Sequence, residues 1–149
     1  MEHTDVSKEI SKLEAGDLAG NPGPARTNTI LLVDDSFDTL LITKLFLSNF
    51  GCVVHAFPTV EGALAEFDPK LHDLVVTDNT MPGMTGAEMA HIIKLRSPSP
   101  PVVMYSGNPQ NDRSCLDKVI EKPAELSLLK EAVDRLLSGR PPGGIGQGP

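Results

Sequence analysis

The sequence predicts one α/β domain in which a parallel β-sheet is covered by helices on both faces. Two observations support this fold class. Short apolar runs alternate with segments of helical periodicity between residues 29 and 137, and glycine, proline, asparagine and aspartate separate them. Strands that alternate with helices are joined by right-handed crossovers, which produce a parallel sheet.

The first strand and the helix after it show the pattern clearly. Residues 29–33 form a strand in which four consecutive apolar residues follow Thr29, as expected when both faces of a strand are covered. The next helix begins at a cap provided by Ser36 or Asp38 and ends near residue 50, before Gly51. We expect its buried stripe to contain Leu41, Leu45 and Phe37.

Four further strands and three further helices follow at regular intervals. The strands are predicted at residues 52–57, 73–77, 102–105 and 118–121. The helices are predicted at residues 59–67, with Thr59 as cap, 86–95 and 125–137. Five strands in about 110 residues fit a flavodoxin-like, doubly wound domain. The residues expected to face the core from the last two helices are Met89, Ile92, Ile93, Leu128, Leu129, Ala132, Val133, Leu136 and Leu137.

The chain is predicted to contain one domain between two flexible ends. Residues 1–28 form a flexible N-terminal segment, residues 29–138 the domain, and residues 139–149 a flexible tail rich in glycine and proline. The net charge of −7 argues against nucleic-acid binding. No signal peptide and no membrane-spanning run is evident, so we expect a cytoplasmic protein without a membrane partner. Cys52 and Cys115 suggest neither a disulfide framework nor a metal site.

Polar side chains follow four of the predicted strands at the point where each strand ends. They are Asp34 and Asp35 after the first strand, Asp78 after the third, Ser106 after the fourth, and Lys122, with Pro123 next to it, after the fifth. Taken singly, each could be a helix cap, a turn residue or a solvated charge. The carboxyl ends of parallel strands meet at one edge of a sheet, where such sheets bind ligands. Together these residues therefore predict a site.

Three of these side chains are carboxylates. If the first and third strands are neighbours, their backbones lie about 4.8 Å apart, and the carboxylates cannot all stay ionised without a cation. Mg²⁺ fits because it takes one or two carboxylates and keeps several waters. Asp78 could then attack a phosphoryl group. Ser106 could donate a hydrogen bond to a phosphoryl oxygen, and Lys122 could neutralise another.

The segment from residue 29 to residue 137 resembles the receiver domain of two-component response regulators. The resemblance rests on the acidic pair Asp34-Asp35, on Asp78 followed by NTMPGMTG, on Ser106-Gly107 and on Lys122-Pro123. It implies the strand order 2-1-3-4-5 and makes Asp78 the phosphoacceptor.

The resemblance also implies a metal site and the roles of its ligands. Asp35 and Asp78 would bind Mg²⁺ directly, together with the backbone carbonyl of Thr80. Asp34 would act through water.

Further residues are implied to act on the phosphoryl group. Ser106 would turn its hydroxyl toward this group, and Lys122 would pair with it. The peptide bond between Lys122 and Pro123 would be cis. Thr80 and Asn108 occupy positions that tune how fast the phosphoryl group is lost.

The chain departs from the receiver pattern in two places. Receivers usually carry tyrosine or phenylalanine three residues before the lysine, where this chain has Val119, and Tyr105 lies elsewhere. In addition, the fifteen residues 107–121 must supply a strand and two loops. We therefore predict that the fourth helix of a receiver is a single turn or absent. The apolar face formed by Val102, Met104 and Val119 would then lack cover and recruit a partner, a second copy or the chain's own tail.

These observations predict a stand-alone receiver that takes a phosphoryl group from a sensor histidine kinase or phosphotransfer protein. It would signal through a downstream protein partner or pass the phosphoryl group on. It would catalyse only its own modification, so we do not expect an enzyme in the usual sense. The alternative is a docking module that does not depend on phosphorylation. A phosphatase with an aspartyl intermediate fits less well, because its nucleophile usually follows the first strand within a D-x-D pattern.

Overall fold

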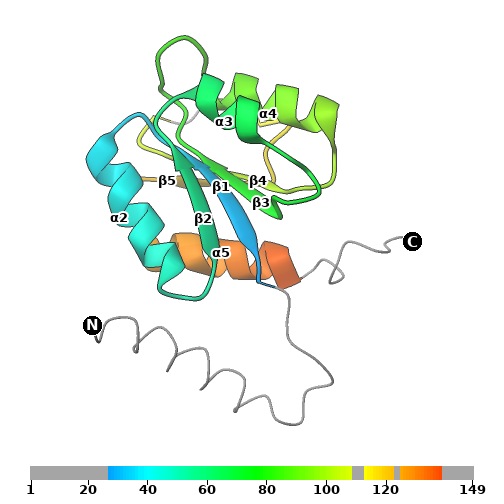
Figure 1. Cartoon of the computed structure of the whole chain (residues 1–149). Helices are drawn as coiled ribbons and strands as arrows, with labels where there is room; N and C mark the ends of the chain where they lie inside the picture. The colour runs from blue at the N-terminus through cyan, green and yellow to red at the C-terminus, as the bar shows by residue number, and fades with distance from the viewer. Residues whose placement is uncertain (1–26, 109–112, 123–124, 139–149) are drawn as a thin grey trace, which may run out of the picture.

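The computed structural model describes residues 27–108, 113–122 and 125–138. These residues form one sheet flanked by helices (Figure 1). The strands are β1 (Thr29–Val33), β2 (Val53–Phe57), β3 (Leu74–Thr77), β4 (Val102–Ser106) and β5 (Lys118–Glu121). The helices are α2 (Phe37–Ser48), α3 (Val60–Glu66), α4 (Gly86–Arg96) and α5 (Leu126–Ser138). The predicted elements are all present, with ends that differ by one or two residues at most positions.

All strand pairs are parallel, and the strand order is β2-β1-β3-β4-β5. This confirms the predicted fold. Helices α2 and α5 cover one face of the sheet, and α3 and α4 cover the other (Figure 1). Val33 of β1 pairs with Thr77 of β3, so the two strands end side by side. The residues that follow them, Asp34 and Asp78, are thereby neighbours.

The inner strands are buried along their whole length. Every residue of β1, β3 and β4 is buried, which explains their continuous apolar sequences. Successive side chains point to opposite faces, so Ile30 joins the core beneath α2 and α5. Leu31 joins the second core beneath α3 and α4. Both side chains are fully buried.

Three helices begin at the side-chain caps that the sequence offers. Ser36 caps α2 and Thr59 caps α3, each by accepting a backbone N–H of the first turn. Thr85 and Glu88 form a reciprocal capping box at α4. Of the two cap candidates for α2, the structure thus selects Ser36 over Asp38.

The predicted buried stripe of α2 is wrong. Phe37 is 68% exposed, Leu41 44% and Leu45 60%. The residues that α2 buries are Leu40, Thr43 and Leu47. Because this helix is apolar on nearly every side, periodicity did not single out one stripe. The direction from which the sheet approaches decides which face is covered.

Four other expected core residues lie nearer the surface. Ile92 of α4 is half-buried, as are Leu136 and Leu137 of α5, whereas Met89 and Ile93 are fully buried as predicted. On α5, Leu128 is 49% exposed, whereas Leu129 and Val133 are fully buried.

The segment between β4 and β5 contains no helix in the part that the structure describes. Residues 113–117 form a turn, and residues 109–112 lie outside the described ranges. Cys115 and Leu116 pack against the core beneath α3 and α4. Val102 belongs to the same core. Val102 and Met104 are both 0% exposed, and Val119 is half-buried. The expectation that this apolar face lacks cover is therefore wrong for Val102 and Met104.

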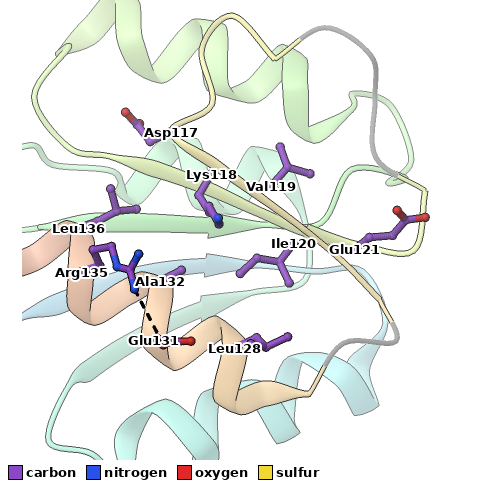
Figure 2. Close-up of a pocket in the computed structure, with 10 residues that line it drawn as sticks. All are labelled: Asp117, Lys118, Val119, Ile120, Glu121, Leu128, Glu131, Ala132, Arg135 and Leu136. Carbon is purple, nitrogen blue, oxygen red and sulfur yellow. Dashed lines mark ion pairs between the residues drawn. The ribbon is translucent and has the colours of Figure 1, made fainter.

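The edge strand β5 and helix α5 enclose a groove of about 490 Å³ (Figure 2). Ile120 and Lys118 border it from the strand, and Leu128 borders it from the helix. An ion pair between Glu131 and Arg135, with an N···O distance of 3.9 Å, lines the groove on the side of α5. The groove is separate from the carboxylates at the strand ends.

Several predictions fall mainly on residues outside the described ranges and stay predictions. They concern the flexible segment 1–28, the tail 139–149 and the cis bond before Pro123. Among the described residues, no helix has the length and apolar character needed to cross a membrane.

Candidate phosphoacceptor site

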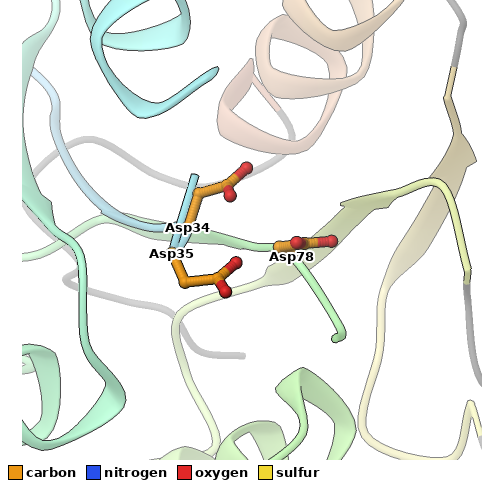
Figure 3. Close-up of side chains that lie close together, drawn as sticks. All are labelled: Asp34, Asp35 and Asp78. Carbon is orange, nitrogen blue, oxygen red and sulfur yellow. The ribbon is translucent and has the colours of Figure 1, made fainter. Parts of the chain in front are cut away.

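Three carboxylates meet at the carboxyl ends of β1 and β3 (Figure 3). One carboxylate oxygen each from Asp34, Asp35 and Asp78 lies within 4.8 Å of those of the other two. Asp34 is buried, Asp78 is half-buried and Asp35 is exposed. The backbone N–H of Asp78 donates to Val33 O over 3.0 Å, so sheet pairing holds Asp78 at this position. We call these three residues the acidic cluster.

Lys122 brings a positive charge to the acidic cluster. Its Nζ lies 3.1 Å from Asp34 Oδ2, and Asp34 Oδ1 accepts the backbone N–H of Ser36 over 2.9 Å. Burial nevertheless raises the pKa of Asp34 above its ordinary value, and the charge of Asp78 acts in the same direction. The Ser36 hydrogen bond and Lys122 oppose this shift. The cluster therefore holds more negative charge than the lysine balances.

The backbone around Asp78 is tightly packed. The N–H of Asn79 donates to Asp78 Oδ1 over 2.8 Å, and the Thr77 hydroxyl donates to Asp78 O over 2.7 Å. A Cβ atom on Gly86 would lie 2.0 Å from Asp78 O. Glycine is therefore required at residue 86, where the start of α4 approaches the end of β3.

Asn79, the first residue of the NTMPGMTG run, is a site residue that was not predicted as one. It is 2% exposed. Its Oδ1 accepts the N–H of Ala87 over 3.2 Å, and its Nδ2 donates to Asn108 O over 3.1 Å. Asn79 thus ties the residue after Asp78 both to α4 and to the loop after β4. Its position directly after Asp78 was the only signal in the sequence.

Ser106, Asn108 and Thr80 meet beside the acidic cluster. Ser106 is 1% exposed, and its Oγ accepts the backbone N–H of Asn108 over 3.1 Å. The side chain of Asn108 donates to Thr80 Oγ1 over 3.4 Å. The structure therefore brings together two residues that are 28 positions apart in the sequence.

The donor set of the acidic cluster suits a hard divalent cation. Three carboxylates face one lysine among the described residues that contact them. Carboxylate oxygens are the ligands that Mg²⁺ prefers, and an exposed ligand such as Asp35 leaves room for bound waters. The residues present therefore fit Mg²⁺, and the carbonyl of Thr80 stays a predicted ligand.

The family model named response regulator receiver domain matches residues 30–138. The chain belongs to this family, whose members are phosphoacceptor signalling modules of two-component systems. This agrees with the resemblance seen in the sequence.

Curated relatives share the receiver over most of this chain. The two-component response regulator ARR3 of Arabidopsis thaliana is 30% identical over 133 residues, which cover 82% of this chain and 58% of ARR3. The aerobic respiration control sensor protein ArcB of Escherichia coli is 28% identical over 138 residues, which cover 87% of this chain and 17% of ArcB. The chain thus spans only part of the length of these relatives.

Solved structures agree with the fold. The response regulator TrrA of Thermotoga maritima, solved in complex with Mg(2+)-BeF, is 28% identical with a TM-score of 0.70. The match covers 74% of this chain and 100% of the TrrA chain. A CheY-like receiver domain protein of Methanospirillum hungatei is 26% identical with a TM-score of 0.72, covering 76% of this chain and 96% of its own.

Proposed function

We propose that Asp78 accepts a phosphoryl group from a phosphohistidine on a sensor histidine kinase or phosphotransfer protein. The observation that carries this proposal is the acidic cluster, whose carboxylate oxygens lie within 4.8 Å of one another while Lys122 binds Asp34. Family membership supports the same chemistry.

The transfer forms one bond and breaks one bond. A carboxylate oxygen of Asp78 attacks the phosphorus atom, and the phosphorus–nitrogen bond to the donor imidazole breaks. The imidazole nitrogen keeps the electron pair of that bond. The hydrogen bond from Asn79 N–H to Asp78 Oδ1 fixes the rotation of the carboxylate before the attack.

Lys122 and Ser106 stabilise the charge that gathers on the phosphoryl oxygens. Lys122 supplies an ammonium group, and Ser106 supplies a hydroxyl donor. Asp34, Asp35 and Asp78 would hold Mg²⁺ together with the Thr80 carbonyl, and the bound ion would neutralise negative charge on the carboxylates and the phosphoryl group.

The phosphorylated protein signals by binding a downstream protein or by passing the phosphoryl group on. Water eventually removes the group, and the same residues assist that step in the presence of Mg²⁺. The chain turns over no external substrate. A kinase donor of this kind places the protein in the cytoplasm.

The test is the intact mass after incubation with acetyl phosphate and Mg²⁺. Wild type should gain one phosphoryl adduct, and Asp78→Asn should gain none. Asp38→Asn is the matched control, because it removes a carboxylate in the first turn of α2 that lies outside the acidic cluster. It should be labelled as wild type is. Omission of Mg²⁺, or Asp35→Asn, should slow labelling strongly.

If wild type gains no adduct, the binding of beryllium fluoride is measured next. If wild type neither gains an adduct nor binds beryllium fluoride with Mg²⁺, the proposal is wrong. The docking module that does not depend on phosphorylation would then be the better description.

A further inference from the structure

The ring of Tyr105 lies against the ammonium group of Lys122. The distance from Lys122 Nζ to the ring centroid is 5.1 Å, within the roughly 6 Å at which a cation and an aromatic face attract. Tyr105 is 7% exposed. The sequence placed this residue away from the position where receivers usually carry an aromatic side chain, yet the fold brings it to the site.

The sheet determines this contact. Tyr105 is the residue before Ser106 on β4 and pairs with Ile120 of β5. The backbone N–H of Lys122 donates to Ser106 O over 2.9 Å, which fixes the start of the lysine side chain beside the end of β4. Because alternate residues of a strand point to opposite faces, Tyr105 and Ser106 reach the site from different faces of the sheet.

The lysine ammonium therefore lies between two electron-rich groups. One is Asp34 Oδ2 at 3.1 Å, and the other is the face of the Tyr105 ring. Burial raises the pKa of Tyr105, while the charge of Lys122 lowers it and that of Asp34 raises it. The electrostatic environment of the phenol thus includes both partners of the ion pair.

We propose that Tyr105 is a positioning residue for phosphoryl transfer, whose ring holds the Lys122 ammonium at the acidic cluster before phosphorylation. The inference rests on the proposed function. A lysine has a flexible four-carbon stem, and an unsupported ammonium would spend much of its time away from the cluster. While the phosphoryl group is transferred to Asp78, the Lys122 ammonium exchanges Asp34 for the phosphoryl oxygens and keeps its contact with the ring, so the electrostatic surroundings of the ring change.

A pair of variants separates the ring from the hydroxyl. Tyr105→Leu should slow labelling by acetyl phosphate and Mg²⁺ by about five-fold, the size expected for loss of one cation–π contact. Tyr105→Phe keeps the ring and should restore most of the rate. When Lys122→Gln is already present, adding Tyr105→Leu should not lower the labelling rate further. An equal loss in both Tyr105 variants, or the same loss without Lys122, would overturn the proposal.

A second measurement needs no change at residue 105. Tyr105 is the single tyrosine, and the chain has no tryptophan, so ultraviolet-excited emission of the protein reports on this ring. Addition of beryllium fluoride and Mg²⁺ to wild type should change the emission. The change should be absent in Asp78→Asn and strongly reduced in Lys122→Gln.

The outcomes distinguish the two proposals. A phosphoryl adduct in wild type with unchanged tyrosine emission would leave the proposed function intact and overturn the role of Tyr105. The absence of both the adduct and beryllium fluoride binding would overturn the proposed function and this inference with it.

Discussion

Lys94 Nζ of α4 lies 3.0 Å from Oδ2 of Asp117, the residue before β5. The same ammonium donates to Pro100 O over 2.9 Å, and the same carboxylate oxygen accepts the N–H of Val102 over 2.7 Å. Lys94 and Asp117 thus link α4, the loop before β4 and the turn before β5. This link holds the turn that takes the place of a helix.

Replacing Lys94 should loosen that turn. We expect Lys94→Met to lower the free energy of unfolding by about 1–2 kcal/mol, because its hydrogen bonds involve a charged donor that is only partly exposed. Urea denaturation measures this loss. Arg135→Met is the control. The side chain of Arg135 is 77% exposed and that of its partner Glu131 is 63% exposed, so this ion pair should contribute little to the free energy of unfolding. Equal losses in the two variants would contradict the role of Lys94.

The bridge between Asn108 and Thr80 should affect the lifetime of the phosphorylated state. Asn108→Ala removes the amide that spans 3.4 Å to Thr80 Oγ1 beside the acidic cluster. Water should then reach the phosphoryl group more easily, and its loss should become a few-fold faster. The decay of the adduct, followed by intact mass after removal of acetyl phosphate, tests this. An unchanged or slower decay would show that the bridge does not shield the site.

Gly86 should not tolerate a side chain. The Cβ of alanine would lie 2.0 Å from the backbone carbonyl oxygen of Asp78, so α4 or the end of β3 would have to shift. We expect Gly86→Ala to destabilise the protein by about 1–3 kcal/mol and to slow labelling. Gly107→Ala is the matched control, because its nearest neighbour, Lys122 Cβ, would be 4.0 Å away. A stable and normally labelled Gly86→Ala protein would contradict this packing.

Buried His72 and half-buried His55 form a hydrogen-bonded pair. The N–H of Asp68 donates to His72 Nδ1 over 3.1 Å, so neutral His72 carries its proton on Nε2. That nitrogen lies 3.0 Å from His55 Nδ1, which accepts the hydrogen bond. Burial lowers the pKa of His72, with the charge of His55 acting the same way and Asp68 and Asp73 opposing it.

Because of this pair, the free energy of unfolding should decrease as the pH falls. The unfolded chain protonates His72 near pH 6.5, whereas the folded chain protonates it only at lower pH. The contribution of neutral His72 to the free energy of unfolding is therefore complete above the pKa that His72 has in the unfolded chain. It is lost as the pH falls below that value, at up to about 1.4 kcal/mol per pH unit. His72→Gln can keep both hydrogen bonds but does not titrate. Its free energy of unfolding should change less than that of wild type between pH 7 and pH 5, and equal slopes would exclude His72 as the source.

The two faces of α2 should differ sharply in their contribution to stability. Leu47 is fully buried and Leu45 is 60% exposed. Leu47→Ala should cost about 2–5 kcal/mol, and Leu45→Ala should change the free energy of unfolding by less than about 0.5 kcal/mol. Chemical denaturation of the two variants measures the difference. Comparable losses would mean that Leu45 packs against something in the folded protein.

The sequence by itself determined the order and type of the secondary elements and the strand ends that carry Asp34, Asp78, Ser106 and Lys122. Those features depend on local chemistry, namely apolar runs, turn residues and caps, which neighbouring residues specify. The short interval between Ser106 and Lys122 also predicted that the described residues between β4 and β5 form no helix, because chain length limits what fits between two strands.

Which side chains meet depends on how the elements pack against one another. The buried face of α2, the contact of Tyr105 with Lys122 and the cover that Cys115 and Leu116 give to the sheet all depend on elements far apart in the sequence. The direction of approach between packed elements sets such contacts, and neither the periodicity of a single helix nor the alternation of a single strand contains that direction.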